Sequence, residues 1–201
     1  MTYSVVIFLA VLVGIAFIAV LWGAGIYNQL VTLKNRYQNA FSQIEVQLKR
    51  RYDLIPNLVE TAKGYMAHER GTLEAVISAR NKAVGGLEKA AANPGDPQAM
   101  RALASAEQGL SGALGRLFAV AEAYPDLKAS TNFLELQREL TETEDRIAAG
   151  RRFYNANVRA LNTRVESFPS NLVASTFGFH QAEYFEVEDE AVRTAPTVDF
   201  T

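Results

Sequence analysis

VVIFLAVLVGIAFIAVLWGAG, residues 5–25, is an uninterrupted apolar run, and every Lys, Arg, Asp and Glu of the chain lies after it. Thirteen of its 21 residues are Val, Ile, Leu or Phe, which favour transfer into a bilayer. A helix of this length is about 31 Å long, which matches the thickness of a hydrocarbon core. Tyr3 and Trp22 bracket the run, where aromatic rings suit the two membrane interfaces. The run therefore predicts a transmembrane anchor within residues 1–25.

A cleaved signal peptide is the competing interpretation of this run. It would have a positively charged start, a shorter apolar core and a small-residue cleavage site, and the sequence shows none of these. The chain contains no Cys, which excludes a lipidated cysteine, disulfides and thiolate metal sites. Lys34 and Arg36 follow the run and no basic side chain precedes it. The positive-inside rule therefore predicts a single-pass protein of the cell (inner) membrane with a cytoplasmic C-terminal body.

Charge divides the rest of the chain into two parts. Residues 26–168 carry 19 basic and 16 acidic side chains, a net charge of +3, whereas residues 169–201 carry one basic and six acidic side chains, a net charge of −5. The overall net charge of −2 argues against a nucleic-acid partner. We expect an anchor (residues 1–25), one helical body (residues 26–168) and an acidic, aromatic C-terminal tail (residues 169–201).

Helical periodicity begins directly after the anchor. Apolar or small residues recur at alternating spacings of four and three, at positions 26, 30, 33, 37, 40 and 44. The first body helix is therefore expected to continue out of the membrane. Asp53 suits the capping position of a second helix with Pro56 in its first turn, so the chain is expected to reverse direction there.

Turn residues divide the remainder of the body. They lie at residues 93–97, at residues 124–126 and at Pro169, so helices are expected to end at Ala92, to span residues 98–123, and to run from Ser130 or Thr131 to residue 168. Short connections favour antiparallel neighbours. The fold class is therefore all-α, with an N-terminal transmembrane helix continuing into an elongated antiparallel helical bundle of about four long helices. In the tail, residues 184–188 are expected to form a short strand.

Two stretches of the body resemble a known family. They are LKRRYDLIPNLV at residues 48–59, and YPDLK at residues 124–128 running on to Tyr154-Asn155 and Phe168-Pro169. Together with YNQLV at residues 27–31 and the leading apolar helix, they make the sequence similar to the LemA family of bacterial membrane proteins. The resemblance implies an N-terminal anchor and a long antiparallel helical domain. It implies no reaction.

The sequence offers no catalytic, cofactor-binding or metal site. His68-Glu69 begins like a zinc-protease motif, but Thr72 stands where the second His would be required. No glycine-rich loop is followed by Lys-Ser or Lys-Thr, so phosphate binding has no support. An enzyme would need a buried cluster of titratable groups, and we expect none. No cofactor is expected either.

Two groups of side chains are candidates for interaction or for turns. The first is the basic stretch Lys49, Arg50 and Arg51 with Asp53 and Pro56, interpreted as a solvated turn about 40 Å from the bilayer. At that distance an anionic leaflet exerts little force, so these residues are expected to face a protein partner or the tail. The second group is aromatic and lies in the tail, at Phe177, Phe179, Tyr184 and Phe185.

These observations predict a membrane-anchored, non-enzymatic scaffold or adaptor that acts through protein–protein interaction. Two pairs of small residues four apart, Ala10 with Gly14 and Ala19 with Gly23, favour homo-oligomers in lipid, the alternative being that small residues are simply common in membrane spans. Other membrane proteins are possible partners, and the alternative function is that of an anionic-lipid-binding or membrane-organising protein.

The tail and the last body helix carry two further expectations. Counting the helices places the start of the tail at the membrane surface, and its aromatic residues suit docking onto a helical surface or a partner, a disordered tail being the alternative. On the last helix Asn155, Asn157 and Asn162, with Glu144 and Arg151, are candidates for polar contacts between helices, the alternative being that most of them are simply exposed to solvent.

Overall fold

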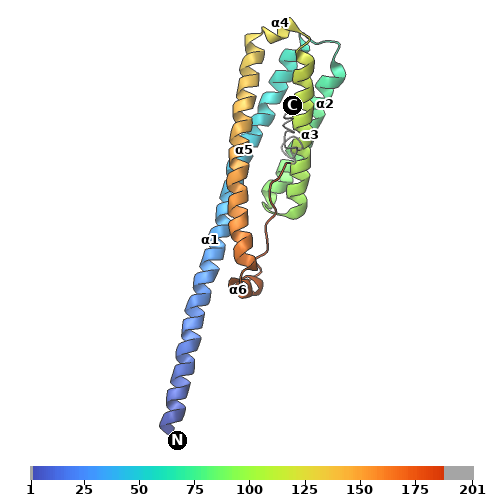
Figure 1. The fold of residues 1–201 in the computed structure, drawn as a ribbon. Helices are drawn as coiled ribbons and strands as arrows, with labels where there is room; N and C mark the ends of the chain where they lie inside the picture. The colour runs from blue at the N-terminus through green and yellow to red at the C-terminus, as the bar shows by residue number, and fades with distance from the viewer. Residues whose placement is uncertain (1, 188–201) are drawn as a thin grey trace, which may run out of the picture.

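The computed structural model describes residues 2–187 of the 201-residue chain, and these form an elongated molecule built of helices (Figure 1). In chain order the elements are α1 (Thr2–Lys63), α2 (Arg70–Ala92), α3 (Pro97–Ala121), α4 (Pro125–Lys128), α5 (Thr131–Glu166) and α6 (Ser170–Thr176). The four long helices run alternately away from and toward the N-terminal end, with α4 at one end of the bundle and α6 at the other. The expected all-α class, an apolar N-terminal helix leading into an antiparallel bundle, is confirmed.

Helix α1 joins the apolar run to the bundle without interruption. Near its start lies the one segment of the described chain that is long and apolar enough to cross a membrane, with a mean hydropathy of 3.1 over 18 residues and none of them buried. From Ile26 onward one face of the helix turns inward, and Leu30, Tyr37, Ala40 and Ile44 are buried. The division of the chain at residues 25 and 168 stays a prediction.

The expected reversal at Asp53 is wrong. Helix α1 continues through Pro56 to Lys63, and the chain reverses between α1 and α2. A proline inside a helix lacks the N–H that would bond to the carbonyl four residues earlier, here that of Tyr52. Arg80 of α2 supplies the missing donor, because its Nε lies 3.1 Å from the Tyr52 carbonyl oxygen. A tertiary hydrogen bond thus offsets part of the cost of the proline, and the local sequence does not reveal it.

The other helix ends lie close to the expected positions. Helix α2 ends at Ala92, and the Asp96 carboxylate caps α3 by accepting a hydrogen bond of 2.8 Å from the Ala99 N–H. Helix α5 begins at Thr131 after Ser130, whose side chain makes no capping bond, and it ends at Glu166. The short helices α4 and α6 were not expected.

Two glycines permit close packing between helix pairs. A Cβ added at Gly150 of α5 would lie 2.8 Å from Cγ1 of Ile44 in α1, and one added at Gly86 of α2 would lie 3.3 Å from Cα of Leu103 in α3. The bundle therefore consists of two tight pairs, α1 with α5 and α2 with α3, which lie side by side (Figure 1).

The lengths of the helices leave room for the tail. Helix α5 has 36 residues, whereas α2 and α3 have 23 and 25, so the lower part of the α1–α5 pair extends beyond the α2–α3 hairpin. Helix α6 lies at this lower end, and the chain then returns upward along the bundle (Figure 1). Residues 184–187 form no strand, contrary to expectation, and Glu188 lies outside the described residues.

Candidate functional site

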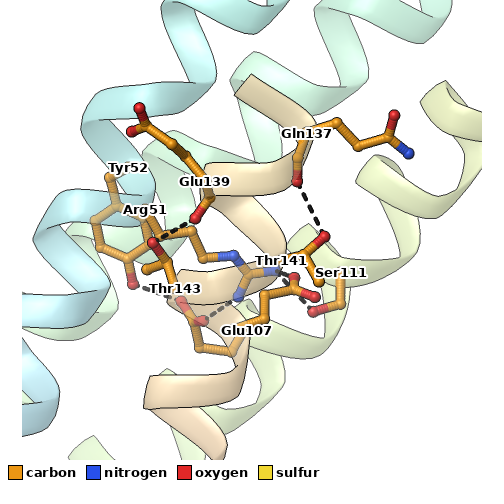
Figure 2. Close-up of polar contacts among 9 residues, drawn as sticks. Arg51, Tyr52, Glu107, Ser111, Gln137, Glu139, Thr141 and Thr143 are labelled. Atoms are coloured by element: carbon orange, nitrogen blue, oxygen red, sulfur yellow. Dashed lines mark hydrogen bonds and ion pairs between the residues drawn. The ribbon is translucent and has the colours of Figure 1, made fainter. Parts of the chain in front are cut away.

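A cluster of charged and polar side chains joins α1, α3 and α5 (Figure 2). Arg51 lies on the buried face of α1 between Leu48 and Ile55, and only 3% of its surface is exposed. Glu107 of α3 is also 3% exposed and lies between Leu103 and Leu110. Both residues occupy positions where the helical period requires a core side chain. The bundle therefore contains an ion pair in place of two apolar contacts.

Arg51 connects three helices through its guanidinium. Its Nη1 donates to Glu107 Oε2 at 2.8 Å, and its Nη2 donates to Ser111 Oγ at 3.0 Å and to Glu144 Oε1 at 2.7 Å. Glu107 and Ser111 belong to α3, and Glu144 belongs to α5. Because the guanidinium presents its donors in a fixed planar fork, these bonds set the register of α1 against both neighbours.

Tyr52 completes the coordination of the buried carboxylate. Its hydroxyl donates to Glu107 Oε1 at 2.5 Å, so both oxygens of Glu107 accept hydrogen bonds. The Tyr52 ring is buried, and its hydroxyl also lies 3.4 Å from the Ala83 carbonyl of α2. Together with the Arg80 bond to the Tyr52 carbonyl, this brings α2 into the same network. The four long helices thus meet at one polar layer.

Burial controls the protonation of this layer. Desolvation raises the pKa of Glu107 above its usual range, and the Arg51 charge and the Tyr52 hydroxyl offset only part of the shift. Desolvation also raises the pKa of Tyr52, and the neighbouring Glu107 charge adds to that effect. Tyr52 therefore remains a protonated hydrogen-bond donor. Arg51, Glu107 and Tyr52 are each exposed by 3% or less, whereas Ser111 and Glu144, which accept from Nη2 of Arg51, lie at the surface.

Thr143 is a second polar residue at a core position of α5. It is 2% exposed, and its hydroxyl donates to the Glu139 carbonyl of its own helix at 2.7 Å. Figure 2 shows the same arrangement two residues earlier, where the Thr141 hydroxyl bonds to the Gln137 carbonyl. These hydroxyls are satisfied within α5 and bind nothing from another helix.

The structure separates the five residues that were expected to form a basic turn. Lys49 is exposed and pairs with Glu45 one turn earlier at 2.6 Å, while Arg50 lies at the surface, 3.7 Å from Glu139 of α5. Asp53 and Pro56 are exposed on the continuous helix α1. Arg51 points into the core, so the expectation that it is solvated is wrong. Whether the exposed members contact a partner stays a prediction.

A signal for the cluster was present in the sequence. The spacing of four and three continues beyond Ile44 through Leu48, Arg51 and Ile55, which places Arg51 at a core position. In α3 the same spacing runs through Leu103, Glu107 and Leu110. Sequence reasoning ended the apolar stripe of α1 at Ile44 and did not place Glu107 in the core of the third long helix. A buried cluster of titratable groups was not expected, and that expectation is wrong.

Two asparagines of α5 hold the tail. The Asn162 side chain donates to the Ala182 carbonyl and accepts from the Ala182 N–H, both at 2.9 Å. Asn155 does the same for Phe185, accepting from its N–H at 2.8 Å and donating to its carbonyl at 3.2 Å. Each amide therefore pairs with the backbone of one tail residue. Asn157 instead bonds to the carbonyl of Phe153 in its own helix, at 2.8 Å.

Glu183 ties the tail to the α2–α3 hairpin. Its carboxylate accepts from Arg101 Nε at 3.0 Å and from Nη2 at 3.2 Å. Its backbone N–H donates to the Gly95 carbonyl at 2.9 Å, and its carbonyl accepts from the Tyr154 hydroxyl at 2.8 Å. Gly95 has a φ of 90°, and a Cβ there would lie 2.9 Å from Cβ of Ala182. Only glycine fits this turn beneath the tail.

The four aromatic candidates of the tail have different environments. Phe185 is 1% exposed, and the Arg151 guanidinium lies 5.9 Å from its ring centre. Phe179 and Tyr184 are partly buried against the core. Phe177 is 61% exposed and lies at the lower end of the bundle. The tail, as far as residue 187, therefore docks on helices of its own chain, away from the basic stretch of α1.

An open apolar groove lies at the opposite end of the bundle. It has a volume of about 1090 Å³ and is formed by the end of α1 and the first half of α2. Val59, Leu73 and Ile77 are among its lining residues, and Lys63 and Arg70 add charge. Within residues 2–187 no group of three or more His, Cys, Asp or Glu side chains is placed to hold a metal ion.

Comparisons with known proteins identify the family of this chain. The family model described as "LemA family" matches residues 40–200, which include the polar layer. Magnetosome protein MamQ 2 of Paramagnetospirillum magneticum is 33% identical over 196 residues, covering 89% of this chain and 70% of that protein. Magnetosome protein MamQ of Magnetospirillum gryphiswaldense is 30% identical over 177 residues, covering 79% and 64%. Protein LemA of Metamycoplasma hominis is 30% identical over 162 residues, covering 81% and 69%. The chain therefore belongs to the LemA family.

Proposed function

We propose that this protein is a membrane-anchored helical scaffold or adaptor that acts by binding proteins, copies of itself included, and not by turnover. The observation that carries this proposal is the placement of its polar chemistry. Arg51 and Tyr52 are buried and both donate to the buried Glu107 carboxylate, while the groove between α1 and α2 stays open and apolar. A surface of this kind suits a protein partner better than a small substrate.

The groove is the surface at which we expect contact with a partner. A photo-crosslinking residue at Ile77, which is half-buried in the groove, would be compared in cells with one at Glu142, an exposed position on α5. We expect discrete protein adducts from position 77 and none from position 142. Equal adducts from both positions, or none from either, would contradict a role for the groove.

The anchor and its orientation form the second part of the proposal. Residues 5–25 cross the cell membrane, and the bundle lies in the cytoplasm, because Lys34 and Arg36 follow the apolar run. Since the chain has no Cys, Ser130→Cys creates a unique thiol at the end of the bundle far from the anchor. We expect a maleimide that does not cross the inner membrane to label it only after lysis. Labelling in intact cells would contradict the orientation.

Self-association is the third part. A Cβ added at Gly14 or at Gly23 would meet no atom within 4 Å in the single chain. Both glycines are therefore free to pack against another helix. We expect the full chain in mild detergent to form oligomers that Gly14→Leu and Gly23→Leu weaken and that Val13→Leu leaves intact. A strict monomer over a wide concentration range would contradict self-association.

Two other functions have less support. Binding of anionic lipid by the basic stretch would require Lys49 near the bilayer, but α1 is continuous, and 24 helical residues beyond Gly25 place Lys49 about 36 Å away. That distance is several Debye lengths at physiological salt. An enzymatic function has less support because Arg51 and Glu107 are each only 3% exposed and offer a substrate no open access. A purified chain that retains a nucleotide or metal would favour it.

A further inference from the structure

We propose that the base of the bundle inserts apolar side chains into the interface of the bilayer that α1 crosses. This base, here called the basal foot, comprises residues 167–179, which include α6. The inference rests on the proposed anchoring by residues 5–25. It adds a second, peripheral contact with the membrane, in which the basal foot touches lipid and not another protein.

The position of the basal foot is fixed by α1 itself. The ring of Tyr27 lies edge-on to the rings of Phe177 and Phe179, with centroid distances of 4.9 and 5.6 Å. Tyr27 follows Gly25, the last residue of the apolar run, by two positions, or about 3 Å along the helix axis. The polar interface on each side of a hydrocarbon core is about 5–7 Å thick. Phe177 therefore lies at the depth of the interface, and Figure 1 shows α6 at this end of the bundle.

The foot presents its large side chains outward. Phe168 is 79% exposed, Leu172 58% and Phe177 61%, whereas Ser170 and Ala174 on the other face of α6 are each 1% exposed. A surface helix in water normally has the reverse arrangement, with its large apolar residues inward. Phe168 precedes α6, Leu172 lies within it and Phe177 follows it, so the basal foot exposes three large apolar side chains near the anchor. These side chains suit an apolar environment and not water.

The foot also lacks charge. Residues 167–182 contain no Lys, Arg, Asp or Glu, and this is the longest uncharged run after the anchor. An ionised side chain would resist entry into the interface, so its absence removes the main obstacle. The acidic part of the tail begins only at Glu183, which is paired with Arg101 on the α2–α3 hairpin. The apolar and acidic parts of the tail are thus separated along the bundle.

The foot is preformed by local hydrogen bonds. The Ser170 hydroxyl lies 2.7 Å from the Arg164 carbonyl and 2.9 Å from that of Ser167, which ties the start of α6 to the end of α5. At its other end, Gly178 has a φ of 69°, and the Phe179 N–H donates to the Ala174 carbonyl at 2.9 Å. This is the Schellman arrangement that ends a helix with a left-handed glycine. Insertion therefore requires little ordering of the backbone.

The test uses tryptophan fluorescence of the full chain in lipid vesicles. Trp22 is the only tryptophan, so Trp22→Phe provides a silent background. Phe168→Trp and Leu172→Trp are added to it singly, and Phe153→Trp serves as the matched control, because Phe153 is 55% exposed on α5 and lies about 20 Å further along that helix. The probes are lipid brominated near the head group and iodide in the water.

We expect the tryptophans of Phe168→Trp and Leu172→Trp to lose emission in brominated vesicles and to be protected from iodide. The control should show the opposite pattern. If both foot variants respond like the control, the proposal is overturned. Protection from iodide without quenching by brominated lipid would mean that protein, such as a second copy, covers the foot, and it would overturn the lipid assignment.

The parent chain separates this proposal from the anchor. Its Trp22 should be quenched by brominated lipid if residues 5–25 cross the bilayer. A quenched Trp22 with water-exposed foot variants would leave the anchor intact and overturn the foot alone. An unquenched Trp22 would overturn the anchor and the foot together.

Discussion

Arg51 places a positive charge on the buried face of α1, where acceptors from α3 and α5 surround it. Arg51→Met would leave Glu107 buried without its charged partner, and such a loss costs about 3–5 kcal/mol of unfolding free energy. Denaturant unfolding of the full chain in mild detergent would measure it. Arg50→Met is the matched control, because Arg50 lies at the surface and its loss should change stability by about 0.5 kcal/mol or less. Equal losses would contradict the buried role of Arg51.

Glu107 gives the same layer a pH dependence. Its pKa in the folded protein is raised above the ordinary value of 4.5, chiefly by burial, so the folded protein binds this proton more tightly than the unfolded chain. The Glu107 contribution to stability is therefore fully present below the unfolded pKa and is lost as pH rises through the folded pKa.

We expect Glu107→Gln to remove this component from the pH profile of the unfolding free energy. The unfolding free energy of the parent, measured relative to that of the variant, should thus fall as pH rises above 4.5. A parent chain that gains stability relative to the variant over that range would contradict the raised pKa.

Helix α1 continues through Pro56, and substitutions at Pro56 and Arg80 test why it does. Pro56→Ala restores the N–H that the Tyr52 carbonyl lacks, so it should stabilise the protein by part of the roughly 3 kcal/mol that an interior proline costs. Arg80→Met should destabilise the parent, because Arg80 supplies the substitute donor. A double-mutant cycle in thermal or denaturant unfolding would show the coupling. Additive effects would mean that Arg80 does not compensate for the proline.

The spacing between α1 and α5 depends on Gly150. In Gly150→Ala the new methyl would lie 2.8 Å from Cγ1 of Ile44, so we expect a loss of about 1–3 kcal/mol from overpacking. Gly112→Ala on α3 meets no atom within 4 Å and should gain about 1 kcal/mol from helix propensity. Unfolding of both variants would be compared, and a loss in Gly112→Ala equal to that in Gly150→Ala would show that the close contact with Ile44 is not the cause.

The docked tail connects parts of the molecule that lie far apart in the sequence, because it joins α5 to the α2–α3 hairpin. Asn162→Ala removes both bonds to Ala182, so we expect faster hydrogen exchange in residues 181–187 without a change in the exchange of the helices. Asn157→Ala, whose amide bonds within its own helix, should leave the tail protected. Fast exchange of the tail in the parent chain would contradict its docking.

Much of this architecture is encoded locally. The apolar run at residues 5–25, the helical spacing after it and the turn residues at 93–97 each act within a few neighbours along the chain, so they predict the exposed apolar helix, the all-α class and the end of α2. The motif at residues 48–59 also indicated the family correctly. Periodicity and backbone chemistry are local properties, and the sequence alone was sufficient for them.

Only the tertiary structure decided the rest. Whether Arg51 is exposed or buried depends on its partners Glu107 and Glu144, which lie 56 and 93 residues away. Whether Pro56 ends α1 depends on a donor 28 residues beyond the Tyr52 carbonyl. The path of the tail depends on the lengths of helices that precede it and on amides 20 and 30 residues distant. In each case a polar group or a backbone break is tolerated because a partner far along the chain satisfies it, and no local pattern specifies that partner.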